Sequence, residues 1–203
     1  MHPFILILLF MSCVILLYFL VFRPWQLTWG STKDEIRQPL LGDDIVLKPH
    51  FVGTRAVHIQ APPAEVWKWI IQIGSARAGW YSIDWIDNAN VPSSNEILPE
   101  YQKIEFDYFV PFTPDQKNGM WVKDFKEPEY ILWWDRKGNG TWGWYLKQNE
   151  SGETRLLTRL RTKYDFSFPW IIYYIVYDFG DIIMMSKCMR GIKERAESNF
   201  SRT

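Results

Sequence analysis

The residues best suited to chemistry lie between positions 77 and 88, where the chain reads RAGWYSIDWIDN. Asp84 and Asp87 are three residues apart, so they would share one face of a helix. A carboxylate set among aromatic rings can act as a general base, and Arg77 could stabilise the negative charge that develops in such a reaction. One hypothesis is therefore an enzyme that abstracts a proton with Asp84 or Asp87.

Three aromatic rings accompany these carboxylates. Trp80, Tyr81 and Trp85 would form a broad amphipathic surface, of the kind that lines the mouth of a ligand pocket. Aromatic residues are also widely used to fill protein cores, so the same rings could simply cap a core edge. The sequence leaves both interpretations open.

Composition excludes several classes of function. The 203 residues are 47% hydrophobic, which suits one well-filled domain, and 23 basic residues balance 23 acidic ones, so no excess charge attracts nucleic acid. The chain contains no HExxH, GxSxG, CxxC or glycine-rich phosphate motif, and its three histidines are scattered. Cys13 and Cys188 cannot form a disulfide framework. We expect no metal, no cofactor and no nucleic-acid partner.

The amino-terminal segment predicts a membrane anchor. Positions 4–22 contain no charged residue and are long enough to cross a hydrocarbon core as a helix. A cleaved signal peptide is the alternative, but no lysine or arginine precedes the apolar run and the residues after it are not small. We therefore assign residues 1–22 to a single transmembrane helix.

The residues after the anchor bear on its orientation. Arg23, Lys33 and Arg37 follow the apolar run, so the positive-inside rule predicts a cytoplasmic carboxy-terminal domain. Residues 23–52 mix charged residues, glycine and proline without a sustained period, which predicts a juxtamembrane tether. The remaining residues, 53–203, form the predicted globular domain.

Hydrophobic periodicity in that domain favours an α+β fold with an antiparallel sheet. Glycine-containing turns at 137–140 and 150–152 are typical of hairpins. A proline pair at positions 62 and 63 suits the first turn of a helix. Strands are expected at 54–60, 120–125, 130–135, 142–147 and 154–164, and helices at 61–73, 93–102 and 179–198.

Two further segments suggest binding surfaces. The expected strand 154–164 would carry Arg155, Arg159 and Arg161 on one face, and Arg159 or Arg161 could meet a ligand carboxylate or phosphate if that face pointed inward. Met185 and Met189 share the apolar face of the last helix. Residues 168–177 are apolar and rich in aromatic residues, so they predict either a buried helix or one lying at a membrane interface.

Short stretches of the chain resemble the START-like helix-grip superfamily, which includes polyketide cyclases and dehydrases. They are TRAV at 54–57, APPAEVW at 61–67, GWYS at 79–82, ILPE at 97–100 and MRGIK at 189–193. The resemblance covers residues 53–198 and implies a curved antiparallel sheet around a long carboxy-terminal helix. It also implies a hydrophobic cavity between the two, holding a lipid, sterol, polyketide or other apolar molecule.

These observations give a leading function and two alternatives. The leading function is membrane-anchored binding or transport of a hydrophobic small molecule or lipid, with Trp80, Tyr81 and Trp85 at the cavity mouth and Met185 and Met189 among its lining. The first alternative is a cyclase- or dehydratase-like enzyme that uses a pocket aspartate. The second is a docking module with a filled core, which binds a membrane or a protein through its exposed aromatic residues.

Overall fold

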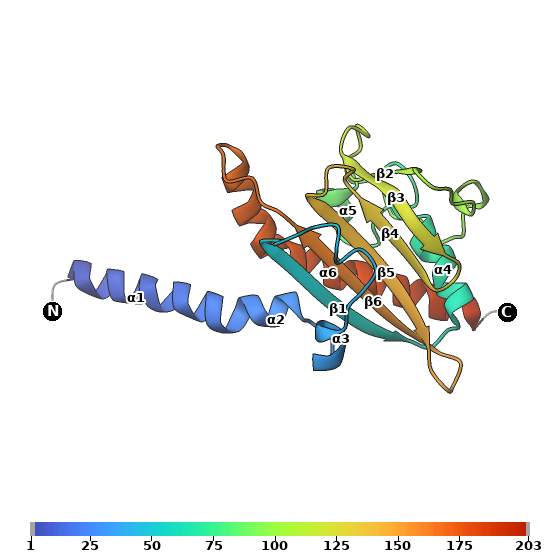
Figure 1. Cartoon of the computed structure of the whole chain (residues 1–203), viewed down its shortest axis with the longest axis horizontal. Helices are drawn as coiled ribbons and strands as arrows, with labels where there is room; N and C mark the ends of the chain where they lie inside the picture. Colours follow the sequence, from blue (N-terminus) through green and yellow to red (C-terminus); the bar gives the residue numbers. More distant parts are fainter. Residues whose placement is uncertain (1–2, 202–203) are drawn as a thin grey trace.

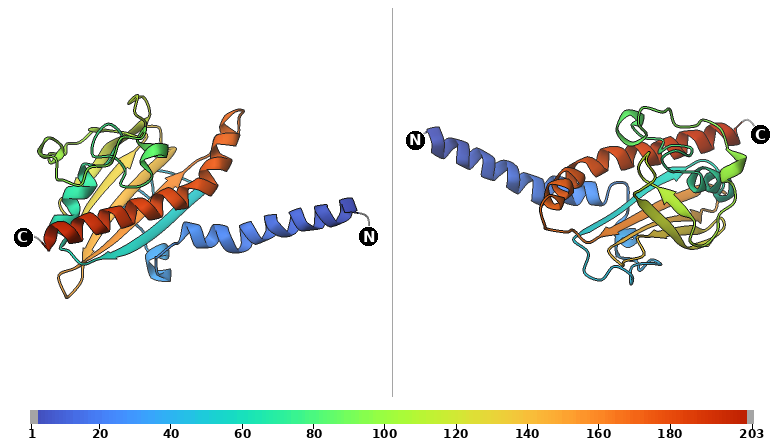
Figure 2. Two further views of the ribbon diagram at one scale, coloured as in Figure 1. Left: turned by 180° about the vertical axis from the view of Figure 1, so that it is seen from behind. Right: turned by 90° about the horizontal axis from the view of Figure 1, so that it is seen from above.

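The computed structural model describes residues 3–201 and has the expected α+β architecture (Figure 1). One six-stranded antiparallel sheet has the order β1-β6-β5-β4-β3-β2, and a long carboxy-terminal helix, α6, lies across one of its faces (Figure 2). The strands are β1 (Phe51–Ile59), β2 (Phe109–Pro111), β3 (Gly119–Lys126), β4 (Tyr130–Trp134), β5 (Gly140–Gln148) and β6 (Thr154–Thr162).

The helices frame this sheet. Those outside the amino-terminal segment are α4 (Pro63–Ile71), the single turn α5 (Asp84–Asp87), the 3-10 turn η2 (Pro99–Tyr101) and α6 (Trp170–Phe200). The helix expected at 93–102 is wrong, because only Pro99–Tyr101 is helical and the rest is irregular. β2 was not predicted, since three residues are too few to show a period of two.

Helix α6 joins the apolar segment 168–177 and the helix expected at 179–198 without interruption. Asp178 and Asp181 lie in its first half, and both have cationic partners. Asp178 pairs with Arg23 at 2.9 Å, and Asp181 pairs with Arg55 at 2.5 Å. These partners allow the helix to continue across two acidic residues in a partly buried setting.

The space between α6 and the sheet is filled by side chains. One hydrophobic cluster includes Met189 and Ile192 of α6 together with Trp133 and Trp144 of the sheet. All four side chains are 0% exposed, so no water-sized space touches them. The hydrophobic cavity expected at this place is therefore not present around these residues.

The amino-terminal helix projects away from the domain. α1 (Pro3–Leu17), the π-helical turn η1 (Tyr18–Phe22) and α2 (Arg23–Leu27) follow one another without a break. The span Pro3–Leu27 is long and apolar enough to cross a membrane, and its most apolar stretch is 0% buried. In the views of Figures 1 and 2, this helix and the first turns of α6 extend from the same end of the domain.

The segment predicted as a tether packs on the face of the sheet opposite α6. A short helix, α3 (Lys33–Arg37), begins at a capping box formed by Thr32 and Glu35. Ala56 N–H donates to the carbonyl of Trp29 at 3.2 Å, which fixes the chain beside β1. Figure 1 looks onto this face, where α3 lies beside the β1 edge and the loop after it passes over the strands. Sheet, α6 and segment 28–50 thus form three layers.

Candidate functional site

The aromatic residues expected at a cavity mouth are mostly core residues. Trp80 is 7% exposed, and its ring stacks on Trp142 of β5 with centroids 5.7 Å apart and planes 3° apart. Tyr81 is 4% exposed and donates from its hydroxyl to the carbonyl of Trp69 at 3.2 Å. Trp85 is 73% exposed and lines no interior space. Trp80 and Tyr81 therefore close the domain interior instead of opening it.

The methionines of α6 belong to the same core. Met185 is 5% exposed and Met189 is 0% exposed, and both lie in the hydrophobic cluster that joins α6 to the sheet. Gly191 allows the helix to come close here, since a Cβ atom at this position would lie 2.3 Å from the carbonyl oxygen of Tyr81. The close approach at Gly191 is therefore made to the 79–82 loop.

The arginines of β6 face away from α6. Arg159 donates to the carboxylate of Asp43 at 2.6 Å and to the carbonyls of Glu35 and Ile36, both at 2.9 Å. Arg161 lies 3.3 Å from the same carboxylate. The proposal that either arginine meets a ligand inside the domain is therefore wrong, because both fasten the 28–50 segment to the outer face of the sheet.

The predicted acid–base residues are not brought together. Asp84 accepts a hydrogen bond from the hydroxyl of Ser93 at 2.5 Å. Burial raises the pKa of Asp87, and the neighbouring charge of Asp84 adds to the effect. Arg77 donates instead to the carbonyls of Ile71 and Ile73 at the end of α4. It therefore completes the helix end, and makes no hydrogen bond to either carboxylate.

A polar junction joins the apolar amino-terminal helix to α6. The side chain of Asp178 accepts from Arg23 at 2.9 Å and from the hydroxyl of Tyr18 at 3.2 Å. The backbone carbonyl of Asp178 accepts from the fully buried Gln26 at 2.7 Å. The ring of Tyr18 stacks on Phe179 with centroids 4.2 Å apart. The π-helical turn at Tyr18–Phe22 is part of this contact region, and such turns are frequent at functional positions.

A second buried ion pair supports the junction from the sheet side. Arg55 of β1 is 1% exposed; it donates to the carbonyl of Gln26 at 2.8 Å and lies 2.5 Å from Asp181 of α6. Burial raises the pKa of Asp181, whereas the guanidinium of Arg55 acts in the opposite direction. The amino-terminal helix, the sheet and α6 therefore meet in one connected set of polar contacts.

The first half of α6 exposes an apolar stripe next to this junction. Ile172, Val176, Phe179 and Ile183 have exposed fractions between 49% and 66%. Their spacing places them on one face of the helix. Between Ile183 and Phe200, the exposed positions of α6 are polar, as at Lys187. Water would therefore contact a continuous apolar surface on the half of α6 nearest α1.

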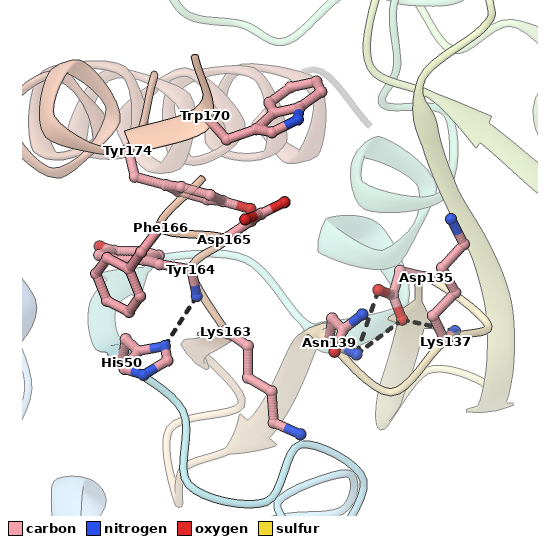
Figure 3. Close-up of a pocket in the computed structure, with 10 residues that line it drawn as sticks. All are labelled: His50, Asp135, Lys137, Asn139, Lys163, Tyr164, Asp165, Phe166, Trp170 and Tyr174. Carbon is pink, nitrogen blue, oxygen red and sulfur yellow. Dashed lines mark hydrogen bonds between the residues drawn. The ribbon is translucent and has the colours of Figure 1, made fainter. Parts of the chain in front are cut away.

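An open pocket of about 600 Å³ lies at the same end of the sheet, where β4 and β6 end and β1 and β5 begin (Figure 3). The amino-terminal helical segment reaches it directly, since Arg23 of α2 donates to the carbonyl of His50 at 3.3 Å. The pocket combines two lysines and a histidine with two aspartates, an asparagine and four aromatic rings. They are His50, Asp135, Lys137, Asn139, Lys163, Tyr164, Asp165, Phe166, Trp170 and Tyr174.

Local hydrogen bonds fix the polar groups of this pocket. The backbone N–H of Tyr164 donates to Nδ1 of His50 at 2.9 Å, so the neutral ring carries its proton on Nε2. Hydrogen bonds from Ser167 lower the pKa of Asp165, which is therefore ionised at neutral pH. Figure 3 shows Trp170, Tyr174 and Asp165 on the α6 side and His50 and Lys163 on the opposite side.

Sequence reasoning missed this pocket as a unit. The aromatic residues of 168–177 stand out in the sequence. His50, however, falls in the predicted tether, and Lys163 falls at the end of a predicted strand. One sequence pattern could have indicated the pocket. Lys163 is followed directly by Tyr164, Asp165 and Phe166, so charged and aromatic residues cluster just before an apolar helix. Among residues 3–201, no group of three or more histidine, cysteine, aspartate or glutamate side chains is placed to hold a metal ion.

Comparisons with known proteins give a fold likeness only. No family model matches the chain, and no curated protein sequence matches it with significance. Among solved structures, the Polyketide_cyc-like protein Cgl2372 from Corynebacterium glutamicum is 13% identical, with a TM-score of 0.47, over 74% of this chain and 94% of its own.

Two further solved structures show the same level of likeness. EF2215 from Enterococcus faecalis, a conserved protein of unknown function, is 14% identical, with a TM-score of 0.46, over 77% of this chain and 86% of its own. Ms6760 from Mycobacterium smegmatis is 16% identical, with a TM-score of 0.39, over 73% and 92%. Similarity at this level assigns neither an activity nor a ligand to the present chain.

Proposed function

We propose that this protein is a membrane-docked module, which α1 anchors across the bilayer and the apolar stripe of α6 holds against its surface. The observation that carries the proposal is the junction at Asp178 and Phe179. Through it, the exposed apolar surface of the anchor continues directly onto the exposed apolar face of α6. The domain would therefore lie on the membrane in one fixed orientation.

The physical chemistry of the stripe supports a lipid surface as its partner. Ile172, Val176, Phe179 and Ile183 would leave water on entering the interface, and each such side chain contributes about 1.5–3 kcal/mol when fully buried. Trp170 and Tyr173, both more than half exposed, are residue types that settle at the headgroup level. A soluble setting would leave this surface in contact with water.

The filled interior favours docking over internal transport. A lipid or polyketide could enter between α6 and the sheet only if Trp80 and Trp142 separated, because their rings stack in the core. The alternative enzyme would need a carboxylate and Arg77 at one place, whereas Arg77 is bound to the end of α4. We therefore place the hydrophobic partner at the surface of the domain, with the domain on the cytoplasmic side as the positive-inside rule predicts.

A depth measurement on the full chain tests this proposal. In a Cys13→Ser/Cys188→Ala background, a spin label is placed at Ile172→Cys in the stripe or at Ser198→Cys, an exposed position at the far end of the same helix. In lipid nanodiscs, the label at 172 should collide more with oxygen, which concentrates in the bilayer. The label at 198 should collide more with a water-soluble nickel complex. Equal, water-like accessibility at both positions would contradict the proposal.

A further inference from the structure

The pocket in Figure 3 is a second feature of the membrane-facing end, and its chemistry is distinct from that of the apolar stripe. It has the size of a small-molecule site, since such sites have volumes of roughly 300–1,000 Å³. Phe166 and Trp170 line it and are also 59% and 53% exposed at the surface beside the stripe. A molecule in this pocket would therefore touch the membrane surface that the proposed function assigns to this end.

The cationic side of the pocket has side-chain hydrogen-bond donors that no acceptor in the described residues uses. Among the described residues, the side chains of Lys137 and Lys163 have no ion-pair or hydrogen-bond partner. His50 offers its Nε2 proton, because Nδ1 already accepts from the backbone of Tyr164. Lysine and imidazole donors of this kind form charge-assisted hydrogen bonds with phosphate oxygens.

The opposite side of the pocket suits a cation. Trp170 and Tyr174 lie there with the carboxylate of Asp165, and Tyr174 stacks on Tyr164 with ring centroids 4.4 Å apart. Aromatic faces beside a carboxylate attract ammonium groups, especially alkylated ones. Asp135 is already engaged, since it accepts from the backbone N–H groups of Lys137 and Asn139.

The two sides together select a zwitterion. Two lysines balance two aspartates, so a ligand with one phosphate diester and one ammonium group leaves the pocket neutral, whereas a purely anionic group would leave it with a net negative charge. We infer that this pocket binds a phosphate–ammonium zwitterion, as found in the headgroup of a zwitterionic phospholipid. The inference rests on the proposed function for the source of the ligand, which is the bilayer beside the pocket.

The test measures which lipid stays bound to the full chain. Native mass spectrometry is carried out from micelles that contain equal amounts of dioleoylphosphatidylcholine and dioleoylphosphatidylglycerol. The wild type should retain phosphatidylcholine preferentially. His50→Gln/Lys163→Gln should retain it roughly tenfold less, since two phosphate donors are weakened. The matched control, Lys147→Gln, removes an exposed lysine at the far end of β5 and should behave as wild type.

A second variant examines the ammonium side. Asp165→Asn keeps an acceptor for the backbone N–H of Ser167 but removes the charge, so it should shift the preference from phosphatidylcholine towards phosphatidylglycerol. The inference would be overturned if the wild type retained phosphatidylcholine and phosphatidylglycerol equally. It would also be overturned if His50→Gln/Lys163→Gln retained as much phosphatidylcholine as the wild type. If the spin label at position 172 still reports a bilayer environment, the docking proposal stands independently.

Free phosphocholine distinguishes the two sources of such a headgroup. Saturation-transfer NMR on the full chain in nanodiscs should show weak binding of phosphocholine that His50→Gln/Lys163→Gln abolishes. If phosphocholine binds while no lipid is retained, the pocket takes a soluble phosphate ester, and the lipid source is wrong. If neither binds, the pocket is not a zwitterion site.

Discussion

Arg159 shows how one side chain can organise a segment of chain. All of its donor nitrogens are used, on the hydroxyl of Thr54, the carboxylate of Asp43 and three backbone carbonyls of residues 35–38. The side chain is 4% exposed in a space that the 28–50 segment closes. Only the planar, permanently charged guanidinium can serve so many acceptors at once.

Replacing this arginine should release the segment. We expect Arg159→Met to lower the free energy of unfolding by about 3 kcal/mol, because Asp43 and several carbonyls lose a buried partner. Denaturant unfolding in detergent, followed by near-ultraviolet circular dichroism, measures the loss. Hydrogen exchange should accelerate at residues 31–46.

The matched control is an arginine whose ion pair is exposed. Arg136 lies 3.2 Å from Asp107, with side-chain exposures of 44% and 68%. Exposed pairs contribute little, so Arg136→Met should change stability by less than about 1 kcal/mol. Equal losses for the two variants would show that burial of Arg159 is not the source of its effect.

The arginines also show where residue-level prediction stops. A period of two correctly groups Arg155, Arg159 and Arg161 on one face of β6, and all three bind the segment that covers that face. The period cannot say which face is inside. Which face lies inside depends on the acidic partners Glu35 and Asp43. Both lie more than a hundred residues earlier, in the segment that the sequence predicts to be a tether.

At the scale of elements, Asp178 couples the amino-terminal helix to α6. It connects Tyr18 and Arg23 to α6, and its backbone carbonyl receives Gln26. Helix α6 also packs on β1 through the Arg55–Asp181 pair. The direction of α1 relative to the sheet therefore depends on a few contacts in the first half of α6.

Weakening this junction should loosen the direction of the anchor. Asp178→Asn removes the charge that holds Arg23 but keeps the side-chain volume. Spin labels are attached at Leu9→Cys on α1 and Glu194→Cys on α6 in the Cys13→Ser/Cys188→Ala background. Pulsed electron paramagnetic resonance then measures the distance between the two labels. We expect a broader distance distribution in the variant than in the wild type. Asp107→Asn, at an exposed ion pair, is the control and should leave the distribution unchanged. An unchanged distribution in Asp178→Asn would show that packing alone orients α1.

Most elements of the domain were predictable because their periodicity is strong. The four strands from β3 to β6 and the second half of α6 fall within a few residues of their expected bounds. The segment 28–50 was not predicted to pack, since it has no sustained period. Thr32 and Glu35 nevertheless have the spacing of a capping box, which signals a helix start in the sequence.

Over the whole molecule, the features that suit a membrane gather at one end. The pocket, the first turns of α6 and the departure of α1 lie there, whereas the β5–β6 turn lies at the opposite end of those strands. The interior between these ends is filled by tryptophan and methionine side chains. The resemblance to helix-grip proteins predicts the layers of this fold, but the cavity that it also implies is not present around Trp133, Trp144 and Met189. The resemblance misses this packing because ring contacts depend on side chains far apart in the chain.

The membrane orientation of the molecule can be measured with an acceptor site that the chain already carries. Asn149-Glu150-Ser151 lies in the exposed turn between β5 and β6, away from the anchor, and matches a glycosylation acceptor. If the domain is cytoplasmic, translation in the presence of microsomes should leave Asn149 unmodified. A polar amino-terminal extension with its own acceptor should be glycosylated in the same molecules, since the two ends of a single span lie on opposite sides.

The Asn149→Gln variant is the control, because it identifies the gel band of protein glycosylated at Asn149. Modification of Asn149 with an unmodified extension would reverse the orientation, and modification of neither end would contradict a transmembrane α1.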